Sequence, residues 1–333
     1  MRSLLVAGLA IMISTPVTAE QVNVYSYRQP DLIRPLTEAF TAKTGIDVKV
    51  VFLKKGLLER LQAEGDRTPA DLVLTTDISR LAELVNAGVT KSVSSDLLSA
   101  NIPAEMRDPD GHWFGLTARA RIVYASTERV ADGEVTTYED LTDPKWKGRI
   151  CTRSGAHAYN LALTSAMIVH HGVDQARDWL QGLKENLARR PQGNDRAQVK
   201  AIWAGECDIA IGNTYYMAAM LAKEEQKPWA QSVRIVFPKF TNGGTHMNVS
   251  GMAMTKSGPN ADNALKLMEF LASEEGQRIY AEIVAEYPVL NSISTSDLVA
   301  SWGTFERDTI GLIDIAAQRA AAVRLVDETG FDN

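Results

Sequence analysis

Long hydrophobic runs are missing from this sequence after residue 20, so nothing beyond that point is long and apolar enough to predict a membrane-spanning segment. The first 19 residues, MRSLLVAGLAIMISTPVTA, combine a basic Arg2, a short apolar run and small residues before Glu20. This pattern predicts a secretory signal peptide that is cleaved after Ala19. A membrane anchor is not expected, because polar residues and a proline at 14–16 interrupt the apolar run. We therefore expect a soluble, exported mature protein.

Cysteine is also scarce, with only Cys151 and Cys207 in the whole chain. In an oxidising compartment outside the cytoplasm, free thiols rarely persist. Each cysteine lies beside a short strand-like run, in GRICTRS and GECDIAI, so we expect one disulfide that joins neighbouring strands. The chain-entropy model gives such a loop roughly 4 kcal/mol of stabilisation. Two buried, unbonded cysteines are the alternative.

Long runs of one charge are absent, and the net charge is −6. Neither nucleic acid nor an anionic membrane surface is therefore an expected partner. The sequence has no G-x-S-x-G, no G-x-G-x-x-G and no P-loop, which argues against the common hydrolase and nucleotide-binding sites. The five histidines show no zinc-binding spacing and are interpreted as ordinary structural residues.

Linkers rich in glycine, serine or proline are absent as well, although the length favours two domains. Short apolar runs alternate with amphipathic stretches, which predicts an α/β protein with a mostly parallel sheet and helices on both faces. A predicted strand late in the sequence could pair with the strands of the first α/β unit. We expect a first lobe of residues 20–120 and about 244–295, and a second lobe of residues 121–243 and about 296–333. Ligands of such sheets bind at the carboxyl ends of strands, here in a cleft between the lobes.

Two adjacent tyrosines, Tyr215 and Tyr216 in GNTYYM, follow one of the predicted strands. Asn213 or Thr214 is the predicted N-cap, which places both tyrosines in the first turn of a helix. Tyr159 has the same position in the helix after the Cys151 strand. If the disulfide makes the two strands neighbours, the three phenols converge, and phenolate oxygens suit a hard trivalent metal ion. The alternative interpretation is that the tyrosine rings pack against the protein as amphipathic side chains, with their hydroxyls at the solvent-exposed edge.

The mature chain resembles the periplasmic ferric-ion-binding proteins of iron ABC importers. The resemblance runs nearly end to end, through VNVYSYR, PADLVLTTDISRLAELVNAG, WFGLTARARIVYAS, YEDLTDPKWKGRI, NTYYMAAM and GTHMNVSGMAMTKSGPNADNALKLMEFLASEEGQRIYAE. It implies the type II fold of periplasmic substrate-binding proteins, with two α/β lobes that close on Fe(III). It also implies that Tyr159, Tyr215 and Tyr216 are iron ligands.

The loop after the first strand departs from the family pattern. Where related sequences place a histidine or a tyrosine, this chain has Gln29 and Pro30. Tyr27 is the candidate ligand from this loop, and Tyr25 shares its strand face, so that packing of both is the alternative. Water or a small anion such as carbonate would complete the iron shell. The residues expected to hold that anion, or to form a second shell around the phenolates, are Arg28, Arg119, Arg121 and Gln29.

The resemblance implies a monomeric, periplasmic binding protein without enzymatic activity, which delivers iron to an ABC permease in the inner membrane. A binding protein of the same fold for a polyamine or thiamine is the nearest alternative. A periplasmic hydrolase is the more distant one.

Overall fold

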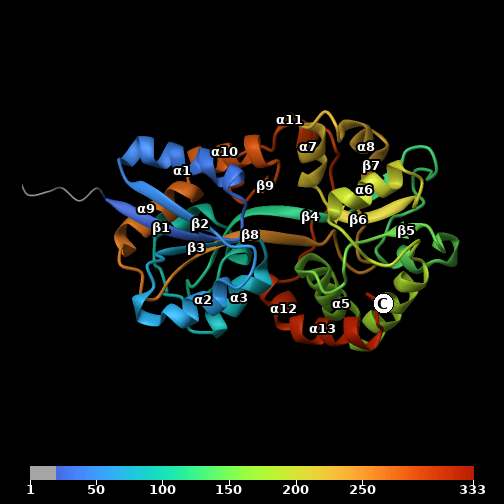
Figure 1. Ribbon diagram of the computed structural model, residues 1–333, viewed down its shortest axis with the longest axis horizontal. Coiled ribbons are helices and arrows are strands. Elements are labelled where there is room, and N and C mark those ends of the chain that lie inside the picture. Colours follow the sequence, from blue (N-terminus) through green and yellow to red (C-terminus); the bar gives the residue numbers. More distant parts are fainter. Residues whose placement is uncertain (1–19) are drawn as a thin grey trace, which may run out of the picture.

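The computed structural model describes residues 20–333, and the expected signal peptide lies outside the described residues. Figure 1 shows two lobes, each a sheet with helices on both faces, and long strands that run between them. The strands are β1 (Gln21–Ser26), β2 (Asp47–Phe52), β3 (Leu72–Thr75), β4 (Phe114–Ser126), β5 (Ile150–Cys151), β6 (Ile209–Asn213), β7 (Val233–Val236), β8 (Met247–Met254) and β9 (Tyr287–Pro288).

The strands form one connected sheet in the order β2-β1-β3-β8-β4-β6-β5, and β7 and β9 also pair with β4. β4 has different neighbours in its two halves. Its first half, up to Ala120, pairs with β8 and β9, whereas its second half, from Arg121, pairs with β6 and β7. All 13 residues of β4 are buried. This single strand therefore belongs to both lobes.

The helices cover both faces of the sheet in each lobe. In the first lobe α1, α9 and α10 lie on one side and α2 and α3 on the other; in the second lobe α6, α7 and α8 lie opposite α5, α12 and α13 (Figure 1). The α-helices are α1 (Pro30–Thr44), α2 (Leu57–Glu64), α3 (Ile78–Asn86), α4 (Asp96–Asn101), α5 (Ala158–Glu185), α6 (Asp195–Trp203), α7 (Tyr215–Leu221), α8 (Lys227–Gln231), α9 (Ala261–Ala272), α10 (Glu274–Val284), α11 (Asp297–Ala300), α12 (Leu312–Ala317) and α13 (Arg319–Glu328). The short 3₁₀ helices are η1 (Gly65–Arg67), η2 (Ala104–Met106), η3 (Glu139–Thr142) and η4 (Pro144–Trp146).

Local sequence explains the ends of α1. Proline is the first residue of this helix, where its missing N–H is not needed, and Gly45 follows the last turn with φ of 74°. The inward side chains Ile33, Leu36 and Phe40 recur at helical spacing and are buried. An amphipathic stretch in the sequence thus forms an amphipathic helix here.

The expected mostly parallel sheet is only partly correct. β1 is parallel to β2 and β3, and β5 is parallel to β6, but β4 and β8 run antiparallel to each other and to their other neighbours. The prediction failed here because a buried strand shows a continuous apolar run whatever the direction of its neighbours.

A second-lobe side chain binds β4 and the residue just before β8, where the chain crosses between the lobes. The hydroxyl of Tyr138 donates a hydrogen bond to the carbonyl oxygen of Arg121 at 2.5 Å and accepts one from the backbone N–H of His246 at 3.0 Å. Tyr138 is fully buried, and the indole N–H of Trp179 in α5 binds its carbonyl oxygen at 2.8 Å. The crossing strands are thus tied to the second lobe at this point.

Among the described residues, none of the helices combines the length and the apolar character that crossing a membrane requires.

Candidate metal centre

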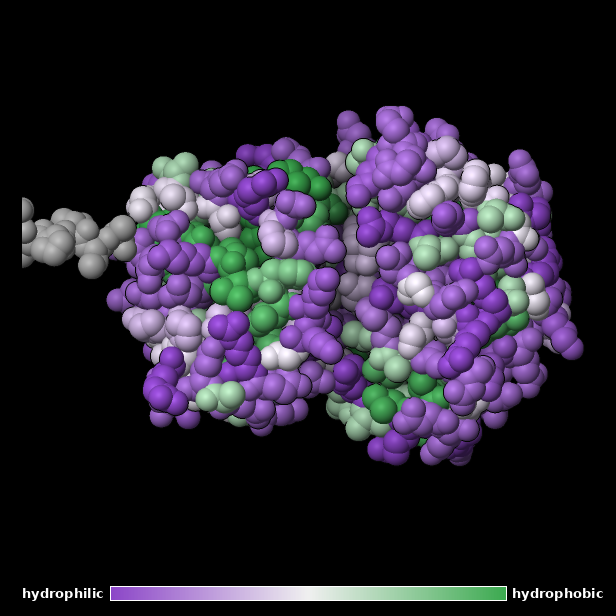
Figure 2. All heavy atoms as spheres, in the orientation of Figure 1, coloured by the Kyte–Doolittle hydropathy of each residue, from purple (hydrophilic) through white to green (hydrophobic). Residues whose placement is uncertain are grey.

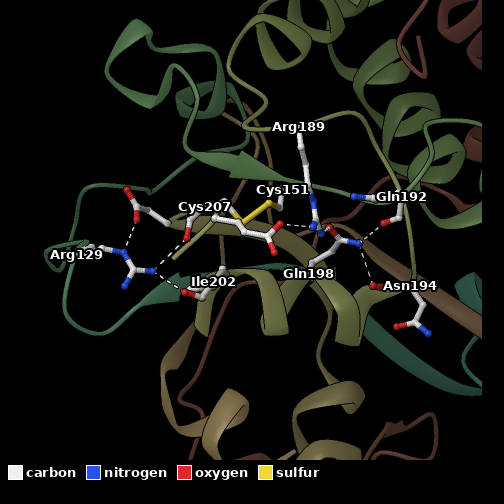
Figure 3. Close-up of a disulfide and its surroundings, with 10 residues drawn as sticks. Arg129, Cys151, Arg189, Gln192, Asn194, Gln198, Ile202 and Cys207 are labelled. Atoms are coloured by element: carbon white, nitrogen blue, oxygen red, sulfur yellow. Dashed lines mark hydrogen bonds and ion pairs between the residues drawn. A yellow bond between two sulfur atoms is a disulfide. The ribbon is translucent and has the colours of Figure 1, made fainter. Parts of the chain in front are cut away.

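The two cysteines join the strands that lead into the tyrosine-bearing helices. β5 and β6 pair in parallel, with Ile150 opposite Ile209. Cys151 and Cys207 are bonded through their sulfur atoms, and their Cα atoms are 5.9 Å apart (Figure 3). The expected disulfide between neighbouring strands is confirmed, and both cysteines of the sequence take part in it.

The three phenols of the second lobe lie side by side. Because β5 and β6 are parallel, the chain leaves both strands at the same edge of the sheet and then enters α5 and α7. Tyr159 is the second residue of α5 and Tyr215 the first of α7, and their hydroxyl oxygens are 3.1 Å apart. The ring centroids of Tyr215 and Tyr216 are 4.3 Å apart. All three side chains are half-buried.

The first turns of these helices differ from the expectation in one respect. Thr214 precedes α7, but its backbone is helical and its hydroxyl, which is buried, has no hydrogen-bond partner. Neither Thr214 nor Asn213 caps α7 with its side chain. In α5 the cap is His157, whose Nδ1 accepts a hydrogen bond from the backbone N–H of Tyr159 at 3.2 Å.

Burial keeps the phenols of Tyr215 and Tyr216 protonated in the metal-free protein. It raises the pKa of Tyr215 well above its ordinary value, and the neighbouring Tyr159 and Tyr216 raise this pKa further. The pKa of Tyr216 is also raised, first by burial and then by Tyr159. Arg119 beside Tyr215 and Arg153 beside Tyr216 act in the opposite direction, because a positive charge favours the phenolate.

Two arginines of the second lobe lie beside Tyr159. The guanidinium carbons of Arg121 and Arg153 are 5.8 and 5.2 Å from the centre of its ring. Both arginines form ion pairs with Asp195, which is fully buried at the start of α6. The sequence predicted Arg121 but missed Arg153 and Asp195.

Arg119 and Arg28 approach the site from the first-lobe side. Arg119 donates to the carbonyl oxygen of Thr76 and, at 3.4 Å, to the hydroxyl of Ser250. Arg28 also donates to Ser250, and it forms an ion pair with Glu286 at 2.8 Å. Arg119 lies 5.4 Å from the ring centre of Tyr159, measured from its guanidinium carbon. The structure thus brings Arg28, Arg119 and the phenols into one region.

The residues expected from the N-terminal loop are placed differently. Gln29 is exposed at the start of α1. The hydroxyl of Tyr27 accepts a hydrogen bond from the backbone N–H of Leu57 at 3.1 Å, and Arg80 lies over its ring at 3.9 Å. The hydroxyl of Tyr25 donates to Glu64 at 2.8 Å. In this structure both tyrosines therefore make contacts within the first lobe.

Tyr159 lines a very small pocket together with Arg119, Arg121 and His246. Both ring nitrogens of His246 are buried without a hydrogen-bond partner, and burial followed by the nearby arginines lowers its pKa to about 3. Histidine is therefore present here as a neutral ring. Within residues 20–333, no three His, Cys, Asp or Glu side chains are grouped so that they could hold a metal ion. The phenols of Tyr159, Tyr215 and Tyr216 are therefore the candidate oxygen donors for a metal ion at this edge of the sheet.

The surface of the molecule is hollowed between the two lobes, and hydrophilic side chains line the rims of this furrow (Figure 2). The family model of the bacterial extracellular solute-binding protein matches residues 36–307. The chain belongs to this family.

Relatives of this chain include iron-binding proteins. This chain is 41% identical to the iron uptake protein A1 of Synechocystis sp., over 95% of its own length and 89% of the relative. The solved structure of the apo ferric ion-binding protein A of Pasteurella haemolytica is 50% identical, covers 95% of this chain and 99% of that chain, and superposes with a TM-score of 0.91. A Trichodesmium protein solved in complex with iron and citrate is 38% identical, with 93% and 99% coverage and a TM-score of 0.88. The chain has the two-lobed type II fold that the sequence predicted.

Proposed function

We propose that this protein captures Fe(III) outside the cytoplasm through the phenolates of Tyr159, Tyr215 and Tyr216, and delivers it to an ABC importer. The observation that carries the proposal is the contact between the hydroxyls of Tyr159 and Tyr215, 3.1 Å apart, with the ring of Tyr216 beside them. The similarity to proteins named for ferric iron binding supports the choice of metal.

The chemistry of the donors favours a hard trivalent ion. Phenolate oxygens are hard, anionic ligands, and a strongly charged metal ion displaces their protons as zinc does from thiols and water. Fe(II) carries less charge and gains less from such ligands. We therefore expect tight binding of Fe(III), and release when the metal is reduced or when protons compete for the phenolates.

Three phenolates leave part of an octahedral shell open. We assign the remaining positions to water or to a small anion such as carbonate, with Tyr27 as the candidate protein ligand from the first lobe. Arg28, Arg119 and Arg121 are the cationic residues that would hold the anion or stabilise the phenolates. Gln29 would contribute from the loop only after its exposed side chain turns inward.

Metal would dock on the second lobe first, because all three phenols belong to it. The first lobe, residues 20–120 and about 244–295, would then close on the second, residues 121–243 and about 296–333. We place this monomer in the periplasm, released there by removal of residues 1–19, with the inner-membrane permease as its partner. No catalytic step is part of this function.

The test is the visible spectrum of the purified protein. Charge transfer from phenolate to Fe(III) absorbs visible light, so the iron-loaded protein should be coloured and should bleach on treatment with dithionite and a ferrous chelator. A colourless protein that retains no Fe(III) in the presence of citrate would contradict the proposal. A polyamine or thiamine that binds instead of iron would then be sought by calorimetry.

A further inference from the structure

A single buried carboxylate connects the elements that carry the three phenols. Asp195 is the first residue of α6 and is 0% exposed. One of its oxygens, Oδ1, accepts from the guanidinium of Arg153 at 3.0 Å. The other, Oδ2, accepts from the guanidinium of Arg121 at 2.9 Å and from the backbone N–H of Asn213 at 3.1 Å. Both oxygens of this carboxylate are thus used.

Each of these contacts leads to a different part of the candidate metal centre. Asn213 ends β6 two residues before Tyr215, so the contact of Asp195 with its backbone N–H holds the chain segment that leads into the tyrosine pair. Arg121 and Arg153 are held beside the ring of Tyr159. The start of α5 is fixed as well, because Arg121 donates to the side chain of Asn160 at 2.6 Å.

We propose that Asp195 is a positioning residue for the metal centre: its carboxylate holds Arg121, Arg153 and the end of β6 in the one arrangement that places three phenol oxygens for a single ion. This inference rests on the proposed function, and it deepens it by assigning a residue that touches neither the metal nor a phenol oxygen. Removing one partner of a buried ion pair leaves an uncompensated charge, so the arrangement depends on Asp195.

The effect of position differs from the effect of charge. When one Fe(III) replaces three phenol protons, three positive charges leave and three enter, so the summed charge of the phenol cluster is unchanged. Loss of the negative charge of Asp195 should therefore change iron affinity little through electrostatics alone. A change of geometry, in contrast, should alter both the affinity and the energy of the charge-transfer band.

The other end of β6 offers a matched control. Asp208, next to the start of this strand, also forms ion pairs with two arginines, Arg129 and Arg149, and it is mostly buried. Within residues 20–333, the side chain of Asp208 forms its hydrogen bonds and ion pairs with these two arginines and with none of the phenols. The variant Asp208→Asn thus removes a carboxylate that lies between two guanidiniums at the other end of β6, away from the phenols.

The experiment compares Asp195→Asn, Asp208→Asn and the wild-type protein by visible spectroscopy and by competition with citrate for Fe(III). We expect Asp195→Asn to shift the band maximum and to lower the affinity at least tenfold, and Asp208→Asn to stay within twofold. An unchanged band and affinity in Asp195→Asn would overturn the inference. So would a lower affinity with an unchanged band, since that result describes structural support alone.

A second variant covers the case in which Asp195→Asn fails to fold. Arg153→Gln removes one of the two arginines that Asp195 holds, at a partly accessible position. We expect a smaller shift of the band maximum than in Asp195→Asn, in the same direction, and a smaller loss of affinity. With Asp195→Asn unfolded, a wild-type spectrum and affinity in Arg153→Gln would overturn the inference. A wild-type protein without any visible band would instead contradict the proposed function itself, and the inference would fall with it.

Discussion

The hydroxyl oxygens of Tyr159 and Tyr215 lie 3.1 Å apart although the two residues are separated by 56 positions in the sequence. Burial and the neighbouring phenols raise the pKa of Tyr215, so its phenol is protonated at neutral pH, and the two hydroxyls share one hydrogen bond. Under the proposed function, a metal ion bound by both phenols would take the place of this hydrogen bond. The contact would then place two of the proposed ligand oxygens side by side before metal binds.

Removing a single phenol oxygen should weaken the charge-transfer band without unfolding the protein. Tyr159→Phe and Tyr216→Phe keep the ring and its packing, so we expect a weaker, shifted band and a lower iron content in each variant. Visible spectroscopy and metal analysis measure both effects. Tyr25→Phe is the control, because Tyr25 hydrogen-bonds Glu64 in the first lobe. If both variants match the wild-type protein in spectrum and iron content, the phenols are not ligands.

Iron binding should release protons. In the metal-free protein the raised pKa values of Tyr215 and Tyr216 keep these phenols protonated, so each phenolate that forms gives up one proton. We expect about three protons per Fe(III) when the ion is supplied as a defined complex, after correction for the protons of that complex. The affinity should fall as the pH is lowered. A titration in weak buffer with a pH electrode counts the protons, and a count near zero would rule out phenolate ligation.

The metal-free protein should lose stability in alkaline solution. Burial raises the pKa of Tyr124 well above its ordinary value, whereas the same phenol in the unfolded chain ionises near pH 10. Above that pH the folded state binds more protons than the unfolded state, so stability is lost as the pH rises. Each such group contributes about 1.4 kcal/mol per pH unit. Thermal unfolding of Tyr124→Phe between pH 9 and 11 should show a shallower decline than the wild-type protein; equal slopes would contradict this origin.

Reduction of the disulfide should destabilise the second lobe. Cys151 and Cys207 are 56 positions apart, and the chain-entropy model assigns a loop of this length roughly 4 kcal/mol. We expect the melting temperature to fall on the order of 10 °C in a strong reductant. Iron affinity should fall too, because the bond joins the strands that precede the phenol-bearing helices. Two alkylatable thiols in the native, oxidised protein would show that the bond is not formed in solution.

Tyr27→Phe should have a smaller effect than the second-lobe variants. In this structure the hydroxyl of Tyr27 accepts from the backbone of Leu57, so it would have to exchange this partner for the metal. We expect a modest change in band intensity and affinity if lobe closure brings this about. No change in either quantity would assign the first lobe's share of the iron shell to water or an anion.

Much of the centre could be predicted from local pattern. Two cysteines next to strand-like runs predicted that the strands are neighbours, and this placed Tyr159 beside the tyrosine pair. These inferences succeeded because a disulfide and a parallel strand pair leave little freedom in where the next helix begins.

The partners of the arginines could not be predicted in this way. Asp195 in the sequence is an ordinary acidic residue in the first turn of a helix, a place where such residues are usually exposed. Only the fold shows that it meets Arg121, 74 positions earlier, and that Glu286 meets Arg28 across 258 positions. Buried ion pairs between distant segments carry no sequence spacing by which they could be recognised.

The hydroxyl of Tyr138 binds the backbone of β4 at Arg121 and the backbone of His246, the residue before β8. This contact attaches both chain crossings to the second lobe. If the lobes close on the metal as proposed, the bending would therefore lie further along the strands, toward the irregularity of β4 between Gly115 and Thr117. The second lobe would keep its shape while the first lobe moves, and the position of the first lobe would then tell a permease whether the protein carries iron.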